Sequence, residues 1–243
     1  MANLLVFPDL PSLTQRAAEL VLQTAQEAAA ARSQFNLALA GGHTPRALYR
    51  RLTEPDLADH FPWSQTHIFW GDERCVPPDH ADSNYRMAYE HLLRNVPLPA
   101  DHIHRMAGED PPEQAAQRYQ AELGRHFGGR PRFDLILLGM GEDGHIASLF
   151  PNTPGIDDPD RWVIVVPHDS PPPPLVTRLS LTLPVLNAAR RLLVLISGVS
   201  KAPALARVAQ GDLSLPAARL RPVEDDLSWL ADADAAAHIS SAS

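Results

Sequence analysis

The sequence contains almost no cysteine and almost no lysine. Cys75 is the only cysteine in the 243 residues, so no disulfide bond can form within the chain, which fits a protein of a reducing compartment. The 21 basic residues comprise 20 arginines and one lysine, Lys201. Alanine and proline are abundant, so the base composition of the genome is a sufficient reason for the arginine excess. The same bias does not account for Lys201, which makes that position a candidate functional residue.

Long apolar runs are missing as well. No stretch approaches the roughly 18 apolar residues of a membrane-spanning helix. The start, MANLLVFPDL, has no basic region and too short an apolar run for a signal peptide, so we expect a cytoplasmic protein. The formal net charge of −8 argues against nucleic acid or an anionic membrane surface as the main partner. An anionic small molecule would need a locally basic pocket.

Three common site motifs are also absent. A single cysteine does not provide the paired Cys/His spacing of a zinc site, and we expect no metal. The G-x-S-x-G of α/β-hydrolases and the Walker loop of nucleotide-binding enzymes do not occur. The loops that follow the predicted strands therefore become the places to look for chemistry.

Predicted strands and helices alternate along the chain. Continuous apolar runs predict buried strands, and apolar residues at helical spacing predict helices. The expected strands are residues 3–7, 35–40, 66–70, 133–138, 162–166 and 191–196. The main expected helices are residues 11–32, 83–94, 112–127 and a segment that starts near Lys201. This alternation predicts a doubly wound α/β fold, a mostly parallel sheet with helices on both faces. No linker composition divides the chain, so we expect one domain over residues 1–243.

Unusual polar loops follow four of the predicted strands. They are GGHTP at 41–45, GDER at 71–74, GMGEDGH at 139–145 and GVSK at 198–201. In open α/β sheets, ligands bind beyond the carboxyl ends of the strands. If these strands are parallel, the four loops lie at one edge of the sheet and can form one site.

The loop at 41–45 has the features of an anion-binding turn. Gly41 and Gly42 let backbone N–H groups, including that of His43, approach an anion, and a helix that begins here adds partial positive charge. The Thr44 hydroxyl can donate to the same anion or cap the helix. An ordinary tight strand-to-helix turn is the alternative interpretation.

Charged side chains mark two further loops. Arg74 can hold a phosphate through two parallel hydrogen bonds, and Asp72 can act as a base or orient one. A solvated salt-bridge cluster is the commoner outcome for such a triplet. The ammonium group of Lys201 suits a phosphate, although a surface lysine at a helix start is the plain alternative.

The loop at 139–145 fits G-x-G-x-x-G but does not predict a dinucleotide site. Glu142 and Asp143 lie inside the loop, where they would repel a pyrophosphate, and Pro151 would end any following helix after about one turn. The loop instead presents His145, which can act as a base near neutral pH, with Asp143 or Glu142 setting its tautomer. We give nine other histidines a structural interpretation: His60, His67, His80, His91, His102, His104, His126, His168 and His238.

Five ordered blocks resemble the 6-phosphogluconolactonase family, within the wider glucosamine-6-phosphate isomerase/6-phosphogluconolactonase group. They are LALAGGHTPRALYRRL (37–52), FWGDERCVPPDHADSNYRMA (69–88), FDLILLGMGEDGHIASLFP (133–151), RLSLTLPVLNAARRLLVLISGVSKAPAL (178–205) and DDLSWLADADAAA (225–237). The resemblance implies a fold of the isomerase and coenzyme A transferase type. It implies hydrolysis of 6-phospho-D-glucono-1,5-lactone to 6-phosphogluconate, the second step of the oxidative pentose phosphate pathway, without a metal or organic cofactor.

The resemblance also implies roles for individual residues. By position, His145 is the base, and Asp72, Arg74 and Lys201 belong to the site. We expect Arg74, Lys201 and the backbone of 41–43 to hold the phosphate, and Asp72 or Asp143 to steady the protonated His145. Arg178 either reaches the substrate or is a solvated arginine. We expect a phosphorylated sugar lactone as the only small-molecule partner, and a monomer or weak homo-oligomer.

Two positions depart from the family pattern, and two other functions stay open. His43 stands where relatives usually have serine, and Ile146 stands where threonine is usual. Relatives that deaminate and isomerise glucosamine 6-phosphate carry Asp-Glu-Tyr where this chain has Asp-Glu-Arg at 72–74, and the continuation RCVP at 74–77 resembles the lactonases. A sugar-phosphate-binding protein without catalysis is the third possibility.

Overall fold

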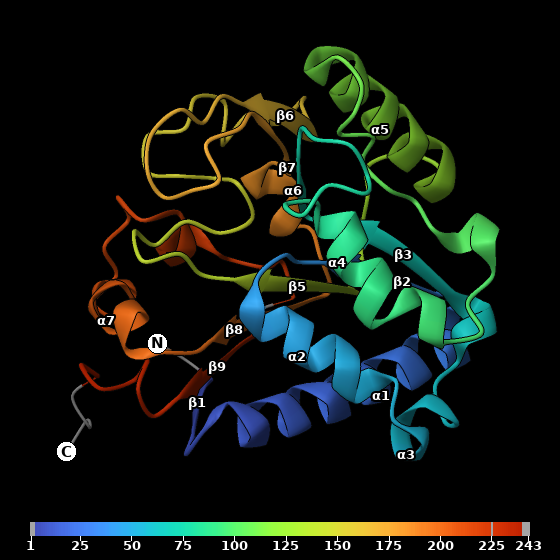
Figure 1. The fold of residues 1–243 in the computed structure, drawn as a ribbon, viewed down its shortest axis with the longest axis horizontal. Helices are drawn as coiled ribbons and strands as arrows, with labels where there is room; N and C mark the ends of the chain where they lie inside the picture. The colour runs from blue at the N-terminus through green and yellow to red at the C-terminus, as the bar shows by residue number, and fades with distance from the viewer. Residues whose placement is uncertain (1–2, 225, 240–243) are drawn as a thin grey trace.

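A six-stranded parallel sheet forms the centre of the molecule in a computed structural model that describes residues 3–224 and 226–239 (Figure 1). Its strands, in spatial order, are β1 (Leu4–Phe7), β9 (Leu227–Asp232), β8 (Arg191–Ile196), β5 (Leu135–Gly139), β2 (Phe35–Leu39) and β3 (Thr66–Trp70). All neighbouring strands in this sheet run parallel. Their carboxyl ends therefore meet at one edge. Asp225, the first residue of the last quoted block, lies outside the described residues.

The central strands consist mostly of apolar residues because both faces of the sheet are covered. All five residues of β2 are buried, and β2 pairs with β3 along its whole length, from Phe35 opposite Thr66 to Leu39 opposite Trp70. The helices are α1 (Leu10–Arg32), α2 (His43–Leu52), α3 (Pro55–Ala58), α4 (Asn84–His91), α5 (Pro112–Phe127), α6 (Leu183–Leu186) and α7 (Ala202–Ala209). The doubly wound α/β prediction is confirmed.

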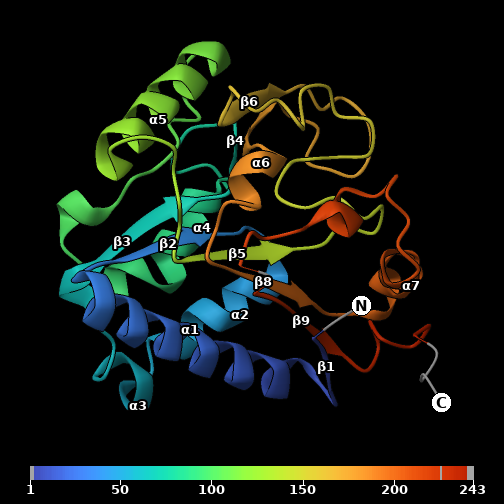
Figure 2. The ribbon, with the colours of Figure 1, turned by 180° about the vertical axis from the view of Figure 1, so that it is seen from behind.

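The longest helix, α1, begins and ends with recognisable caps. The carboxylate of Asp9 accepts a hydrogen bond from the backbone N–H of Ser12 at 2.8 Å, and Ser33 ends the helix in the left-handed conformation with φ of 58°. Its buried face is rich in alanine, which permits close packing against α2 and the sheet. Figure 2 shows this helix running beside β1 and β9. Among the described residues, no helix combines the length and the apolar character needed to cross a membrane.

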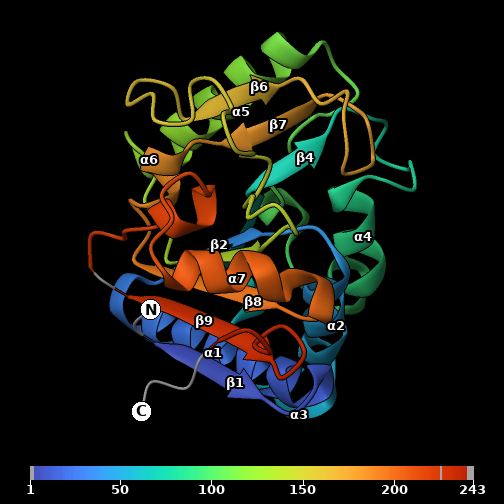
Figure 3. The same ribbon diagram turned by 90° about the vertical axis from the view of Figure 1, so that its left-hand side faces the viewer.

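A second, antiparallel sheet is the feature that the sequence did not predict. Its order is β4 (Asp72–Arg74), β7 (Arg178–Leu181) and β6 (Val163–Val166). Figure 3 shows this sheet stacked above the parallel one, with α5 behind its strands. The expected strand at 162–166 exists, but it belongs here and not to the parallel sheet. Two of the three strands carry charged residues and only three or four residues each, so they lack the apolar run that identifies a buried strand.

Candidate active site

The four loops at the strand ends surround one cavity of about 480 Å³. Of the residues predicted for the site, those that line this cavity are Gly41, Gly42, His43, Thr44, Asp72, Arg74, His145, Arg178 and Lys201. The exception is Asp143, which lies behind His145 and contacts its ring. The parallel strands β2, β5 and β8 deliver three of the loops, and β4 delivers the fourth from the second sheet.

His145 and Asp143 form a close pair. The ring Nδ1 of His145 lies 2.5 Å from Oδ1 of Asp143, and the backbone N–H of His145 donates to the same oxygen at 3.2 Å. Burial alone would raise the pKa of Asp143, but the hydrogen bonds and charge of His145 outweigh it, so the pKa lies below its usual value. An ionised carboxylate only accepts hydrogen bonds, which assigns the proton of a neutral His145 to Nδ1. Nε2 is then the basic atom.

Asp72 has different partners. Its carboxylate accepts a hydrogen bond from the Ser148 hydroxyl at 2.6 Å and from the amide of Asn84 at 3.2 Å, and the side chain is buried. The next acid, Glu73, accepts from the backbone N–H groups of Asn84 at 2.7 Å and Tyr85 at 2.8 Å, which fixes the first turn of α4. Asp72 thus fixes the side chains of Ser148 and Asn84, and Glu73 fixes the first turn of α4.

Arg74 and Arg178 lie directly opposite each other across β4 and β7. Arg178 is only 3% exposed, and burial together with the charge of Arg74 lowers its pKa. The Nε atoms of both side chains are buried without a hydrogen-bond partner, and neither guanidinium forms an ion pair with any described residue. Each donates one hydrogen bond to a backbone carbonyl, Arg74 to Asp82 at 2.6 Å and Arg178 to Pro174 at 3.0 Å. A buried and a half-buried cation side by side, neither paired with a carboxylate, favour an anion between them.

The amino end of α2 faces the same cavity. Gly42 has φ of 102°, and no side chain caps the helix that follows it. In the part of the chain that the structure describes, the N–H groups of Gly42, His43 and Thr44 donate no hydrogen bond to protein. Free N–H groups at a helix start and the helix dipole both favour a negative charge.

Lys201 approaches the cavity from the turn after β8. Its Nζ lies 3.8 Å from Oε1 of Glu142, which is an exposed and therefore weak contact. The turn is held by Asp232 at the end of β9, which accepts from the Ser197 hydroxyl at 2.5 Å and from the Gly198 N–H at 3.0 Å. These hydrogen bonds fix the backbone of the turn that carries Lys201.

Sequence reasoning missed several residues that shape the site. Asn84 links Asp72 to the loop at 41–45, because its Oδ1 occupies the space where a Cβ on Gly41 would lie. Pro172 and Pro173, from a run of four prolines at 171–174, also line the cavity. Asp232 was missed because the strand that it ends, β9, was not among the expected strands.

This architecture defines a doubly wound α/β protein with a histidine–acid pair beside an anion-binding cavity. Residues 8–229 match the family described as glucosamine-6-phosphate isomerases/6-phosphogluconolactonase. The chain belongs to that family.

Named relatives and a solved structure agree with this assignment. The chain is 39% identical to the 6-phosphogluconolactonase of a Nostoc species, with 97% of each chain covered. It is 43% identical to the 6-phosphogluconolactonase of a Synechocystis species, with 92% of each covered. The crystal structure of 6-phosphogluconolactonase from Thermotoga maritima superposes with a TM-score of 0.81 at 30% identity, over 95% of this chain and 99% of that one.

Proposed function

We propose that this protein hydrolyses 6-phospho-D-glucono-1,5-lactone to 6-phospho-D-gluconate, as its named relatives imply. The observation that carries the proposal is the placement of the His145–Asp143 pair beside a cavity with two arginines that form no ion pair, the half-buried Arg74 and the buried Arg178. A phosphorylated lactone needs both parts, a base for the attacking water and cations for the phosphate.

His145 acts as the general base. Its Nε2 takes a proton from water while the water oxygen bonds to the lactone carbonyl carbon. When the tetrahedral intermediate collapses, the ring C–O bond breaks, and the protonated His145 returns its proton to the departing ring oxygen. Asp143 stays ionised, keeps the Nδ1 proton in place and stabilises the imidazolium. Asp72 acts as a positioning residue, since it holds Ser148 and Asn84 and has no contact with His145 in the described structure.

The phosphate is held by charge from three directions. Arg74 and Arg178 supply guanidinium groups from β4 and β7, and Lys201 supplies an ammonium group from the turn after β8. The backbone N–H groups at the start of α2 add further donors. The N–H of His43 can donate to the phosphate even though this position lacks the serine hydroxyl that relatives usually have. The locally basic pocket that a net acidic chain requires is thus built from these few residues.

A coupled assay tests the proposal. The lactone is generated in place, its spontaneous hydrolysis is subtracted, and acid release is recorded with and without the protein. We expect accelerated opening of the phosphorylated lactone and little effect on the same lactone without phosphate. Ammonia release from glucosamine 6-phosphate without lactone opening would identify a deaminating isomerase. Saturable binding of either sugar phosphate with no turnover of either would favour a binding protein.

A further inference from the structure

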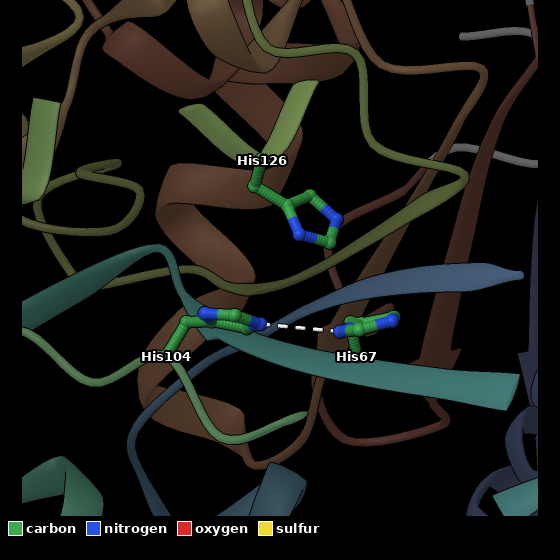
Figure 4. Close-up of side chains that lie close together, drawn as sticks. All are labelled: His67, His104 and His126. Atoms are coloured by element: carbon green, nitrogen blue, oxygen red, sulfur yellow. Dashed lines mark hydrogen bonds between the residues drawn. The ribbon is translucent and has the colours of Figure 1, made fainter. Parts of the chain in front are cut away.

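Three histidines from distant parts of the sequence meet on the far side of the molecule from the candidate active site. They are His67 on β3, His104 after the 3-10 turn Ala100–His102, and His126 near the end of α5 (Figure 4). Each offers a ring nitrogen, and these atoms all lie within 4.8 Å of one another. We call this group the histidine cluster.

The cluster is separate from the site described above. His67 is near the amino end of β3, and the candidate active site lies beyond the carboxyl end of that strand. The stretch from His67 to Trp70 alone spans roughly 10 Å of extended chain. None of the three histidines lines the active-site cavity. The cluster therefore needs a role of its own.

Hydrogen bonds assign the tautomers of two of the rings. Nδ1 of His104 lies 2.8 Å from Oε1 of Glu122, and because a carboxylate only accepts, Nδ1 of His104 carries a proton and Nε2 has the free lone pair. Nε2 of His126 lies 2.7 Å from Oδ1 of Asn36, an amide oxygen, so Nε2 carries the proton and Nδ1 has the lone pair. The orientation of Asn36 is set by Asp134, which accepts from its amide nitrogen at 3.3 Å.

The third ring completes the set. Nδ1 of His67 lies 3.2 Å from Nε2 of His104, the pair joined by the dashed line in Figure 4. Two imidazole nitrogens bound to one tetrahedral zinc ion stand about 3.3 Å apart, because each Zn–N bond measures about 2.0–2.1 Å. The spacing of this pair already fits a shared metal ion. In the metal-bound form His67 would carry its proton on Nε2.

The surroundings suit a metal site as well. Metal-binding histidines usually donate their second ring N–H to a carboxylate or an amide oxygen, which fixes the ring and raises its basicity. Glu122 and Asn36 hold these places here.

We propose that the histidine cluster binds one divalent transition-metal ion of the zinc class through His67 Nδ1, His104 Nε2 and His126 Nδ1. Imidazole nitrogen suits zinc, copper and nickel and suits the oxygen-seeking magnesium and calcium ions poorly. Three protein ligands leave a fourth position for water. The ion ties β3, the segment after residue 102 and the end of α5 together, so its effect is on stability and not on the chemistry at His145.

Zinc binding to the metal-free protein tests the proposal. The protein is prepared without a histidine tag, treated with a chelator and titrated with Zn²⁺ by calorimetry. We expect one ion per chain and a rise in Tm that a chelator reverses, because an ion that binds only the folded state stabilises it. With Co²⁺ in place of Zn²⁺, we expect the visible absorption bands of a tetrahedral site. Lactone hydrolysis is expected to be the same with and without metal.

Variants separate this site from incidental binding. The double variant His104→Gln, His126→Gln is expected to lose at least about 100-fold in zinc affinity, and Glu122→Gln about 10- to 100-fold, since it removes only the support of His104. His60→Gln, at an exposed histidine elsewhere, is the matched control and is expected to bind as the wild type does. If the double variant does not fold, the Glu122→Gln and His126→Gln proteins carry the comparison. Absence of saturable binding, or equal affinity in wild type and cluster variants, would overturn the proposal.

Discussion

Gly141 and the ring of His145 are in such close contact that a side chain at position 141 would displace the ring. A Cβ on Gly141 would lie 2.1 Å from Nδ1 of His145 and 2.7 Å from Oδ1 of Asp143. The backbone N–H of Gly141 also donates to the carbonyl of His145 at 2.9 Å, which closes the loop on itself. The absence of a side chain at Gly141 thus leaves the space that the His145 ring and the Asp143 carboxylate occupy.

Gly141→Ala is therefore expected to displace the imidazole and to spare the fold. The atoms that must move belong to side chains, so the Tm should change little. A misplacement of about 1 Å at a catalytic group can cost roughly 100-fold, and we expect kcat for the lactone to fall by about that factor. Gly124→Ala in α5 is the control, because its Cβ would only touch the Trp162 ring, at 3.5 Å, and Gly124 does not line the cavity. Equal kcat values for the two variants would show that the ring position is not set by Gly141.

Removal of the base itself has a larger expected effect. General base catalysis contributes roughly 10²–10⁴-fold, so His145→Ala should lower kcat by that amount with the fold intact. Asp143→Asn should also lower kcat, roughly 100-fold, because an amide no longer stabilises the imidazolium or secures the Nδ1 proton. Rates on the lactone, with spontaneous opening subtracted, measure both. An Asp143→Asn enzyme with wild-type kcat and an inactive Asp72→Asn enzyme would transfer the acid role to Asp72.

Arg178 is expected to be needed for binding and unfavourable for stability. Its guanidinium is buried next to Arg74 with an unsatisfied Nε, a costly arrangement without an anion. Arg178→Met keeps the apolar stem beside Phe150, over whose ring the guanidinium lies at 5.3 Å. We expect KM to rise at least about tenfold, which corresponds to the loss of a charged contact worth about 1.4 kcal/mol. The Tm should stay equal or rise. Inorganic phosphate should raise the Tm of the wild type more than that of the variant; an unchanged KM would place Arg178 outside the substrate site.

The parallel sheet was predictable because most residues of its strands are apolar. The predicted bounds of β3 and β8, residues 66–70 and 191–196, are those of the structure. The second sheet was not predictable in this way, since the strand status of Asp72–Arg74 depends on pairing with Arg178–Leu181 more than a hundred residues later. The rule that ligands bind beyond strand ends located the cavity, because it needs only the strand ends and their direction.

The contacts between side chains within the site could not be predicted from the spacing of residues along the sequence. Both Asp72 and Asp143 were candidates for the partner of His145, and the structure places only Asp143 against the ring. Asp72 does not pair with His145 because its carboxylate accepts a hydrogen bond from Ser148, a residue distant from it in the sequence. The histidine cluster was missed for the same reason. His67, His104 and His126 have no metal-binding spacing, and they meet only because the segment after residue 102 and the end of α5 both contact β3.

Glu73 is expected to make stability depend on pH. Burial, helped by the charge of Asp72, raises its pKa from 4.5 to about 7 against the hydrogen bonds from the backbone N–H groups of Tyr85, Asn84 and Arg74. Between these two pH values the native state holds a proton that the unfolded state has lost. The contribution of Glu73 is therefore fully present below about pH 4.5 and is lost as the pH rises through 7, a change of up to about 3 kcal/mol.

Glu73→Gln isolates this effect, because the amide does not titrate and resembles the protonated acid in shape. Urea unfolding of both proteins between pH 4.5 and 8 gives the difference in unfolding free energy at each pH. We expect the wild type to lose stability relative to the variant as the pH rises, with the steepest change about midway between the unfolded pKa of 4.5 and the native pKa of about 7. A difference that stays constant across this range would mean that the three backbone donors outweigh burial and that Glu73 is ionised throughout. The start of α4 would then be held by a charged, hydrogen-bonded carboxylate, and Glu73→Gln would be less stable at every pH.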